Sequence, residues 1–225
     1  MRMIGIAAAG FVLAAIPLGA ANVSGAGLTI LAPPDGATLD RSPAQLIASS
    51  PPGALEVTLN FRKLTGVMPV RGGFAGPMDL VAGKNLLVVR SGSETRQITF
   101  EYRANDAGAR PYRYHDPVVI GECNACHPKG GVKTAPATEA ASCDACHDSK
   151  TGFKHLHGPL GAGQCSTCHD PHGSAFPSFL VMDARALCEQ CHAQSRSQAH
   201  IVKSGNKQCQ ECHNPHGSAK QFLLY

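Results

Sequence analysis

The sequence has 225 residues, a length that accommodates one or two small domains. Its formal net charge is only +4 and no run of Lys and Arg stands out, so the sequence offers neither a nucleic-acid-binding patch nor a polybasic lipid-binding segment. Aromatic residues make up only 5% and tryptophan is absent, while 24 glycines and 16 prolines predict many turns and loops.

The first predicted element is a signal peptide over residues 1–26. Arg2 precedes an almost unbroken apolar run from Ile4 to Leu18, and small residues that suit cleavage follow it. The alternative is a retained membrane anchor, but a span needs about 20 apolar residues and this run is shorter. We therefore expect a mature chain without an integral membrane segment, located in the periplasm or secreted to the cell surface after cleavage.

Residues 27–103 alternate between short apolar stretches and turn signals, a pattern typical of a β-sandwich. The predicted strands are Leu28–Leu31, Gln45–Ala48, Leu55–Phe61, Phe74–Val81, Asn85–Val89 and Gln97–Tyr102. The turns at residues 33–36 (Pro-Pro-Asp-Gly) and 83–85 (Gly-Lys-Asn) resemble those of bacterial immunoglobulin-like domains. The resemblance implies an all-β, immunoglobulin-like sandwich in this part of the chain.

The composition changes sharply after a polar segment, residues 104–114, which we interpret as a linker. In the second domain, residues 115–225, apolar residues are sparse, and short helical turns are predicted only near Glu139–Cys146 and Asp183–Cys191. A stretch of this kind cannot build an ordinary core from its side chains, so another group must fill its interior.

All ten cysteines occur in five Cys-x-x-Cys-His motifs, the attachment signature of c-type haem. Two cysteines on one turn can form thioethers with the two vinyl groups of one porphyrin, and the next histidine then binds the iron. Zinc sites and disulfides do not need a histidine after every second cysteine. We therefore predict five covalently attached haems, at Cys123, Cys126 and His127; Cys143, Cys146 and His147; Cys165, Cys168 and His169; Cys188, Cys191 and His192; and Cys209, Cys212 and His213.

The remaining histidines are candidates for the second axial ligand of each iron. There are six of them for five haems: His115, His155, His157, His172, His200 and His216. This supply predicts bis-histidine ligation of most haems, with one histidine to spare. The only methionine of this domain, Met182, is expected to pack against a porphyrin instead.

The histidines also follow an internal repeat. His115 and His157 each precede the first cysteine of a motif by eight residues, and His200 does so by nine. His172 and His216 each follow a motif histidine and a proline, which stiffens the link. A histidine in that position cannot easily reach the far face of its own haem, so we expect it to bind the iron of a neighbouring haem.

The first copy of the repeat lacks the histidine after the proline, since Pro128 is followed by Lys129. One haem there must take its ligand from elsewhere, and His155 is the histidine that we expect to supply it.

The stretch from His157 to His192 resembles the doubled Cys-x-x-Cys-His repeat of multihaem cytochromes related to the cytochrome c3 family, and the resemblance extends over residues 113–220. It implies low-potential bis-histidine haems that serve anaerobic respiratory or extracellular electron transfer. In the family pattern the distal ligands correspond to His157 and His172, with counterparts at His115, His200 and His216.

The sequence thus predicts a pentahaem electron carrier and not an enzyme. Its expected partners are redox proteins: other cytochromes, or a quinol-oxidising or outer-membrane complex. The β-domain is expected to dock such a partner. Two alternatives remain open: a multihaem oxyanion reductase with one open haem site, which the surplus of histidines disfavours, and a subunit of a polymeric cytochrome wire.

Overall fold

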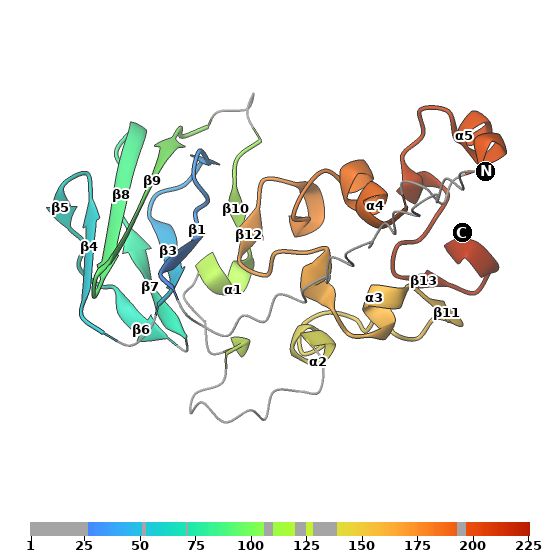
Figure 1. The fold of residues 1–225 in the computed structure, drawn as a ribbon, viewed down its shortest axis with the longest axis horizontal. Helices are drawn as coiled ribbons and strands as arrows, with labels where there is room; N and C mark the ends of the chain where they lie inside the picture. Colours follow the sequence, from blue (N-terminus) through green and yellow to red (C-terminus); the bar gives the residue numbers. More distant parts are fainter. Residues whose placement is uncertain are drawn as a thin grey trace, which may run out of the picture.

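A computed structural model describes residues 27–50, 53–70, 72–105, 110–119, 125–127, 139–192 and 197–225. The predicted signal peptide and Cys123 lie outside these ranges. Two β-sheets form one end of the molecule, and a region of short helices and strands extends from them towards the C-terminus (Figure 1). Within the described ranges, no helix is long and apolar enough to cross a membrane.

Both sheets belong to the N-terminal region. The first is antiparallel and has the order β1 (Thr29–Ala32), β3 (Ala44–Ser49), β7 (Gly73–Met78), β6 (Met68–Val70). The second has the order β2 (Thr38–Leu39), β9 (Glu94–Tyr102), β8 (Gly83–Ser91), β4 (Leu55–Leu59), β5 (Arg62–Lys63), with β2 parallel to β9. All six predicted strands are present with shifted boundaries, whereas the short β2, β5 and β6 were not predicted.

The two sheets share one hydrophobic core. Burial alternates along β8, where Leu87 and Val89 are fully buried, and Leu46 and Met78 of the other sheet belong to the same cluster. Side chains on alternate positions of a strand point to opposite faces, so each sheet presents one apolar face to the other. The prediction of an all-β domain packed in two layers is therefore confirmed.

The rest of the chain consists of short elements. The helices are α1 (Asp116–Val119), α2 (Glu139–Cys143), α3 (Gly158–Gly161), α4 (Ala184–His192) and α5 (Gln198–Ser204), and the 3-10 turns are η2 (Cys165–Thr167), η3 (Pro177–Phe179), η4 (Cys209–Glu211) and η5 (Gln221–Leu223). The strands have two residues each: β10 (Arg113–Tyr114), β11 (His155–Leu156), β12 (Gly173–Ser174) and β13 (Gly217–Ser218). Helices α2 and α4 lie where helical turns were predicted.

Side chains build almost no core in this region. Among the described residues after His115, Ala140 is the one buried hydrophobic side chain, and it is still 8% exposed. This agrees with the expectation that a non-protein group fills the interior.

The internal repeat is visible in the fold. The series η2, β12, η3 recurs as η4, β13, η5, and β12 pairs with β10 as β13 pairs with β11. Both pairs are antiparallel ladders of two residues on each side. The sequence repeat is therefore a structural repeat.

The end of the predicted linker packs against the β-domain. Tyr112 is 4% exposed and belongs to the core of the sheets, and its N–H donates to the carbonyl oxygen of Thr38 at 2.7 Å. The hydroxyl of Tyr114 donates to the carbonyl oxygen of Gln45 in β3, also at 2.7 Å. At this end the segment is a joint between the two regions and not a free spacer.

Candidate haem-binding site

Three of the five motifs fold into the same turn. In the motifs that begin at Cys143, Cys165 and Cys209, the carbonyl oxygen of the first cysteine accepts the N–H groups of the second cysteine and of the histidine, at 2.9–3.2 Å. The motif that begins at Cys188 lies within helix α4. In all four cases one turn of backbone carries two thiols and one imidazole, as thioether attachment of a porphyrin requires.

The thiols of successive motifs lie next to one another. The nine described cysteines are free thiols. Burial and the neighbouring Cys165 raise the pKa of Cys143 to about 11, and burial and the neighbouring Cys209 raise the pKa of Cys188 to about 11. These thiols belong to the second and third motifs and to the fourth and fifth, so motifs adjacent in sequence are also adjacent in space.

Two motif histidines are oriented by the backbone of the following turn. His169 Nδ1 lies 2.8 Å from the carbonyl oxygen of Ser178, and His213 Nδ1 lies 2.7 Å from that of Phe222. A carbonyl oxygen can only accept, so Nδ1 carries the proton and Nε2 keeps its lone pair. This hydrogen bond commonly fixes the tautomer and the ring orientation of a metal-binding histidine.

A polar side chain shapes the short link to the next histidine. The Asp170 carboxylate accepts the N–H of His172 at 2.9 Å, and the Asn214 side-chain oxygen accepts the N–H of His216 at 3.1 Å. Burial opposes the ionisation of Asp170, but the hydrogen bonds and charge of His172 outweigh it and lower the pKa of the carboxyl group. Asp and Asn can both accept this bond, which explains why the repeat tolerates either.

A Gly-Ser pair follows each of these two histidines and holds its strand against a second segment. A Cβ at Gly173 would lie 2.4 Å from the Arg113 carbonyl oxygen, and one at Gly217 would lie 2.8 Å from the His155 carbonyl oxygen, so only glycine allows these strands to approach so closely. The hydroxyl of the buried Ser174 donates to the carbonyl oxygen of Leu180 at 2.5 Å, and Ser218 bonds Leu224 in the same way.

Each ladder brings two predicted distal histidines side by side. The N–H of His115, directly after β10, donates to the carbonyl oxygen of His172 at 3.0 Å. The N–H of His157, after β11, donates to the carbonyl oxygen of His216 at 3.1 Å. Histidines far apart in sequence are thus held in one small backbone unit, from which their side chains reach different motifs.

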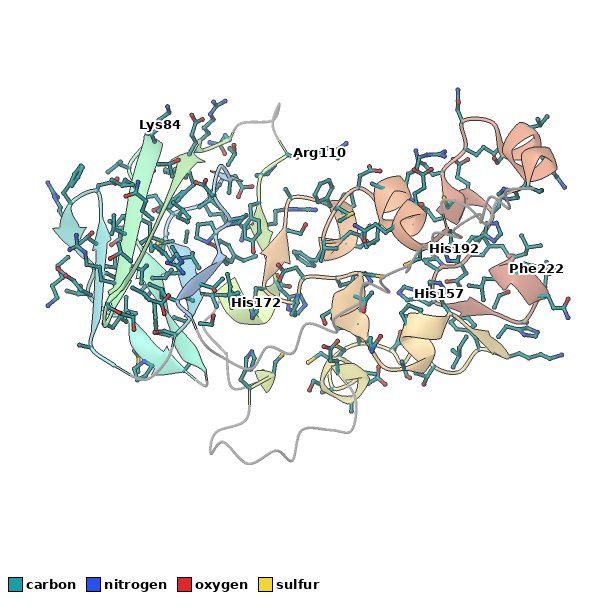
Figure 2. The ribbon with its side chains drawn as sticks, viewed as in Figure 1. Lys84, Arg110, His157, His172, His192 and Phe222 are labelled. Atoms are coloured by element: carbon teal, nitrogen blue, oxygen red, sulfur yellow. The ribbon has the colours of Figure 1, made fainter. Side chains whose placement is uncertain are left out.

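Every motif histidine lies close to one of the other histidines. The five pairs, with the distance between ring centres, are His115 and His147 (5.9 Å), His127 and His172 (6.2 Å), His157 and His192 (5.9 Å), His169 and His216 (6.0 Å), and His200 and His213 (6.0 Å). Figure 2 labels His157 and His192, which approach each other from different segments.

This spacing fits one metal ion between two imidazoles. At metal–nitrogen distances of about 2 Å, two imidazoles on opposite sides of a metal ion place their ring centres roughly 6 Å apart. Burial and the facing motif histidine lower the pKa of His115, His157 and His216, which favours the neutral imidazole that binds a metal. The residues present therefore fit the iron of a haem attached to the adjacent cysteines.

His155 is the predicted ligand that these pairs leave out. It lies in β11, and within the described part of the chain it has no ring partner. The first motif, for which we expected His155, has its histidine paired with His172 instead. The fold thus brings His172, from the second copy of the repeat, next to the histidine of the first motif, and the ligand role expected of His155 stays a prediction. Met182, the methionine expected to pack against a porphyrin, contacts another side chain of the protein: its sulfur accepts a hydrogen bond from the Gln190 amide at 3.0 Å.

Comparison with known proteins supports the same reading. The chain matches the doubled CXXCH motif family over residues 157–197 and 200–225. The motifs indicate covalently attached c-type haem, and the match indicates a region like that of a multihaem c-type cytochrome.

The other comparisons add no functional information. No curated protein matches the chain. Among solved structures, a candidate beta-galactosidase from Bacteroides fragilis matches with 23% identity and a TM-score of 0.28, covering 30% of this chain and 11% of that one. A TM-score this low carries no argument for fold or function.

Proposed function

We propose that this protein is a pentahaem c-type cytochrome that carries electrons, and that two histidines bind each iron. The observation that carries the proposal is the set of five histidine pairs, one for each motif, at the separation that one iron requires. The proposed pairs of motif histidine and distal histidine are His127 with His172, His147 with His115, His169 with His216, His192 with His157, and His213 with His200.

Two imidazoles per iron favour electron transfer over catalysis. A bound haem supplies an iron that gains and releases one electron. With a histidine pair holding each iron, no position would be left for a substrate, and the methionine sulfur that raises the potential of other c-type haems would be absent. We therefore propose low potentials and no enzymatic activity.

The link between His169 and His172 supports close spacing of the haems. The two residues are three apart in sequence, yet His169 pairs with His216 and His172 pairs with His127. The same holds for His213 and His216, which pair with His200 and His169. Two short peptides thus join the first, third and fifth sites in series, which favours fast transfer between them.

The sequence supports a proposal for the cellular setting. The apolar run from Ile4 to Leu18 and the small residues after it support export, so we propose a protein of the periplasm or cell surface that serves anaerobic respiratory or extracellular electron transfer. Its proposed partners are other cytochromes, or a quinol-oxidising or outer-membrane complex. The paired sheets support an immunoglobulin-like assignment of residues 27–103, and the motif repeat supports a relation to the cytochrome c3 family.

Two measurements on the matured protein test this function. Intact mass spectrometry should show five haems attached. Absorption spectra of the oxidised and reduced protein should be purely low-spin, and carbon monoxide added to the reduced form should not change them. Carbon monoxide binding to one haem in five would instead reveal an open site, and a reductase would replace the carrier as the best reading.

A further inference from the structure

We propose that the β-domain is a positioning element for the haem site: through Tyr114 it holds His115 against the iron that His147 binds. This inference rests on the proposed function, because it takes His115 as an axial ligand. It gives the β-domain a role inside the cytochrome in addition to any role in docking a partner.

A continuous series of contacts joins the core of the sheets to His115. Tyr112 is buried in that core, and the Tyr114 hydroxyl bonds the Gln45 carbonyl oxygen of β3 at 2.7 Å. The two tyrosine rings meet edge to face, with centres 5.1 Å apart. His115 follows directly in sequence, so the position of its backbone is set by that of Tyr114.

His115 is also held from its other side. Its N–H donates to the carbonyl oxygen of His172 at 3.0 Å, and its ring meets Phe179 edge to face at 5.4 Å. Figure 2 shows His172 at the end of the motif region that lies next to the sheets. Because His172 and Phe179 hold His115 only from this side, a loosened Tyr114 would act first on His115.

The second copy of the repeat also has an aromatic ring next to its ladder glycine, but from a different part of the chain. There the aromatic ring next to the ladder glycine is Phe153, whose Cβ would lie 2.8 Å from a Cβ at Gly217. In the first copy the ring next to Gly173 is Tyr112, 3.0 Å from a Cβ built there, and Tyr112 is part of the β-domain core. Terminal units of repeat proteins need a special cap because they lack one neighbour. The β-domain, through Tyr112, supplies such a cap to the first copy.

Two matched substitutions in the full-length, haem-loaded protein test the inference. Tyr114→Phe removes the hydroxyl that bonds Gln45. Tyr112→Phe removes a buried hydroxyl that has no hydrogen-bond partner among the described residues, and so it serves as the control. Cyanide is titrated into the oxidised protein, where it competes with each distal histidine for the iron.

The expected result is a change at one haem only. Because a net hydrogen bond changes an equilibrium by about two- to tenfold, Tyr114→Phe should raise the apparent cyanide affinity of one haem by about that factor. Tyr112→Phe should leave all five affinities unchanged. In a His115→Ala background, where one haem is already open, Tyr114→Phe should have no further effect.

The outcomes separate this inference from the proposed function. If His115→Ala opens no haem, the proposed ligand pairing is wrong, and the inference fails with it. If His115→Ala opens one haem but Tyr114→Phe leaves its cyanide affinity unchanged, the pairing stands and the positioning role is overturned. Equal changes at all five haems would also overturn it, because they would show general destabilisation.

Discussion

A methyl group at Gly173 should disturb two distal histidines at once. A Cβ there would lie 2.4 Å from the carbonyl oxygen of Arg113 and 2.9 Å from the Cα of Tyr114, and the φ angle is +154°. Both neighbours are backbone atoms, which cannot turn aside as a flexible side chain can. In the Gly173→Ala protein, β10 must therefore move away from β12.

The expected loss of stability in the Gly173→Ala protein comes from two sources. The backbone conformation costs about 1–3 kcal/mol for a residue with a side chain, and the enforced separation of packed segments costs another 1–3 kcal/mol or so. We expect the free energy of unfolding to fall by about 2–6 kcal/mol. Because His115 and His172 belong to different pairs, both the first and the second haem should then bind carbon monoxide more readily.

Denaturant unfolding and carbon monoxide binding measure the two effects. Gly158→Ala is the matched control, because Gly158 directly follows His157 and a Cβ there meets nothing within 4 Å. If Gly173→Ala unfolds within about 0.5 kcal/mol of the unmodified protein, the range expected of ordinary surface substitutions, and binds no carbon monoxide, then the ladder does not position these ligands.

Five further substitutions, at four residues, probe the same site. His155→Ala should leave the low-spin spectrum unchanged, whereas His157→Ala should open one haem to carbon monoxide, because His157 has a ring partner. Ser174→Ala should lower the free energy of unfolding by about 1–3 kcal/mol, because it leaves the Leu180 carbonyl oxygen without the hydroxyl that bonds it at 2.5 Å. Asp170→Asn should be nearly neutral in denaturant unfolding, whereas Asp170→Ala should cost about 0.5–1.5 kcal/mol, because only the former can still accept the backbone N–H two residues on.

Specific results would contradict the predictions for His155, Ser174 and Asp170. Carbon monoxide binding by the His155→Ala protein would restore the ligand role expected from the sequence. If Ser174→Ala costs no more than the same change at the exposed Ser149, the buried hydroxyl does not stabilise the turn. Equal costs for Asn and Ala at Asp170 would mean that the side-chain oxygen does not hold the link.

The sequence predicted the β-domain where burial follows a regular pattern. Strands such as β8, with buried side chains at every second position, carry a period that can be read from the residues. Strand β5 consists of two exposed residues, Arg62 and Lys63, and such a short strand shows no alternation of burial that a sequence pattern could reveal. The role of Tyr112 and Tyr114 was missed for another reason: they lie in a polar segment, and only the fold shows that their rings reach the core.

The haem motifs were predictable and most of the pairing was not. Attachment chemistry fixes the spacing of the cysteines and the motif histidine, so these residues can be identified without a structure. The partner of each histidine depends on which segments meet in space. His155 and His157 are both histidines near a motif, and only the ladder between β11 and β13 places His157 beside His216. The repeated Gly-Ser after the Pro-His pair was the available signal for that ladder.

The pairing follows one rule across the copies of the repeat. The leading histidine of a copy pairs with the second motif of the same copy: His115 with His147, and His157 with His192. The histidine after the proline pairs with the first motif of the preceding copy: His172 with His127, and His216 with His169.

This rule explains two irregular features of the repeat: the missing histidine after Pro128, and the single motif of the third copy within this sequence. The first copy is preceded by the β-domain and not by another motif, so a histidine after Pro128 would have no motif histidine to pair with. The third copy has one motif within this sequence, and its leading histidine, His200, pairs with that motif at His213. This pair has the largest angle between ring planes, 49°, whereas the pairs that follow the proline rule have 9° and 10°. The departure from the rule thus coincides with a different ring geometry, which makes the fifth haem the one most expected to differ spectroscopically from the others.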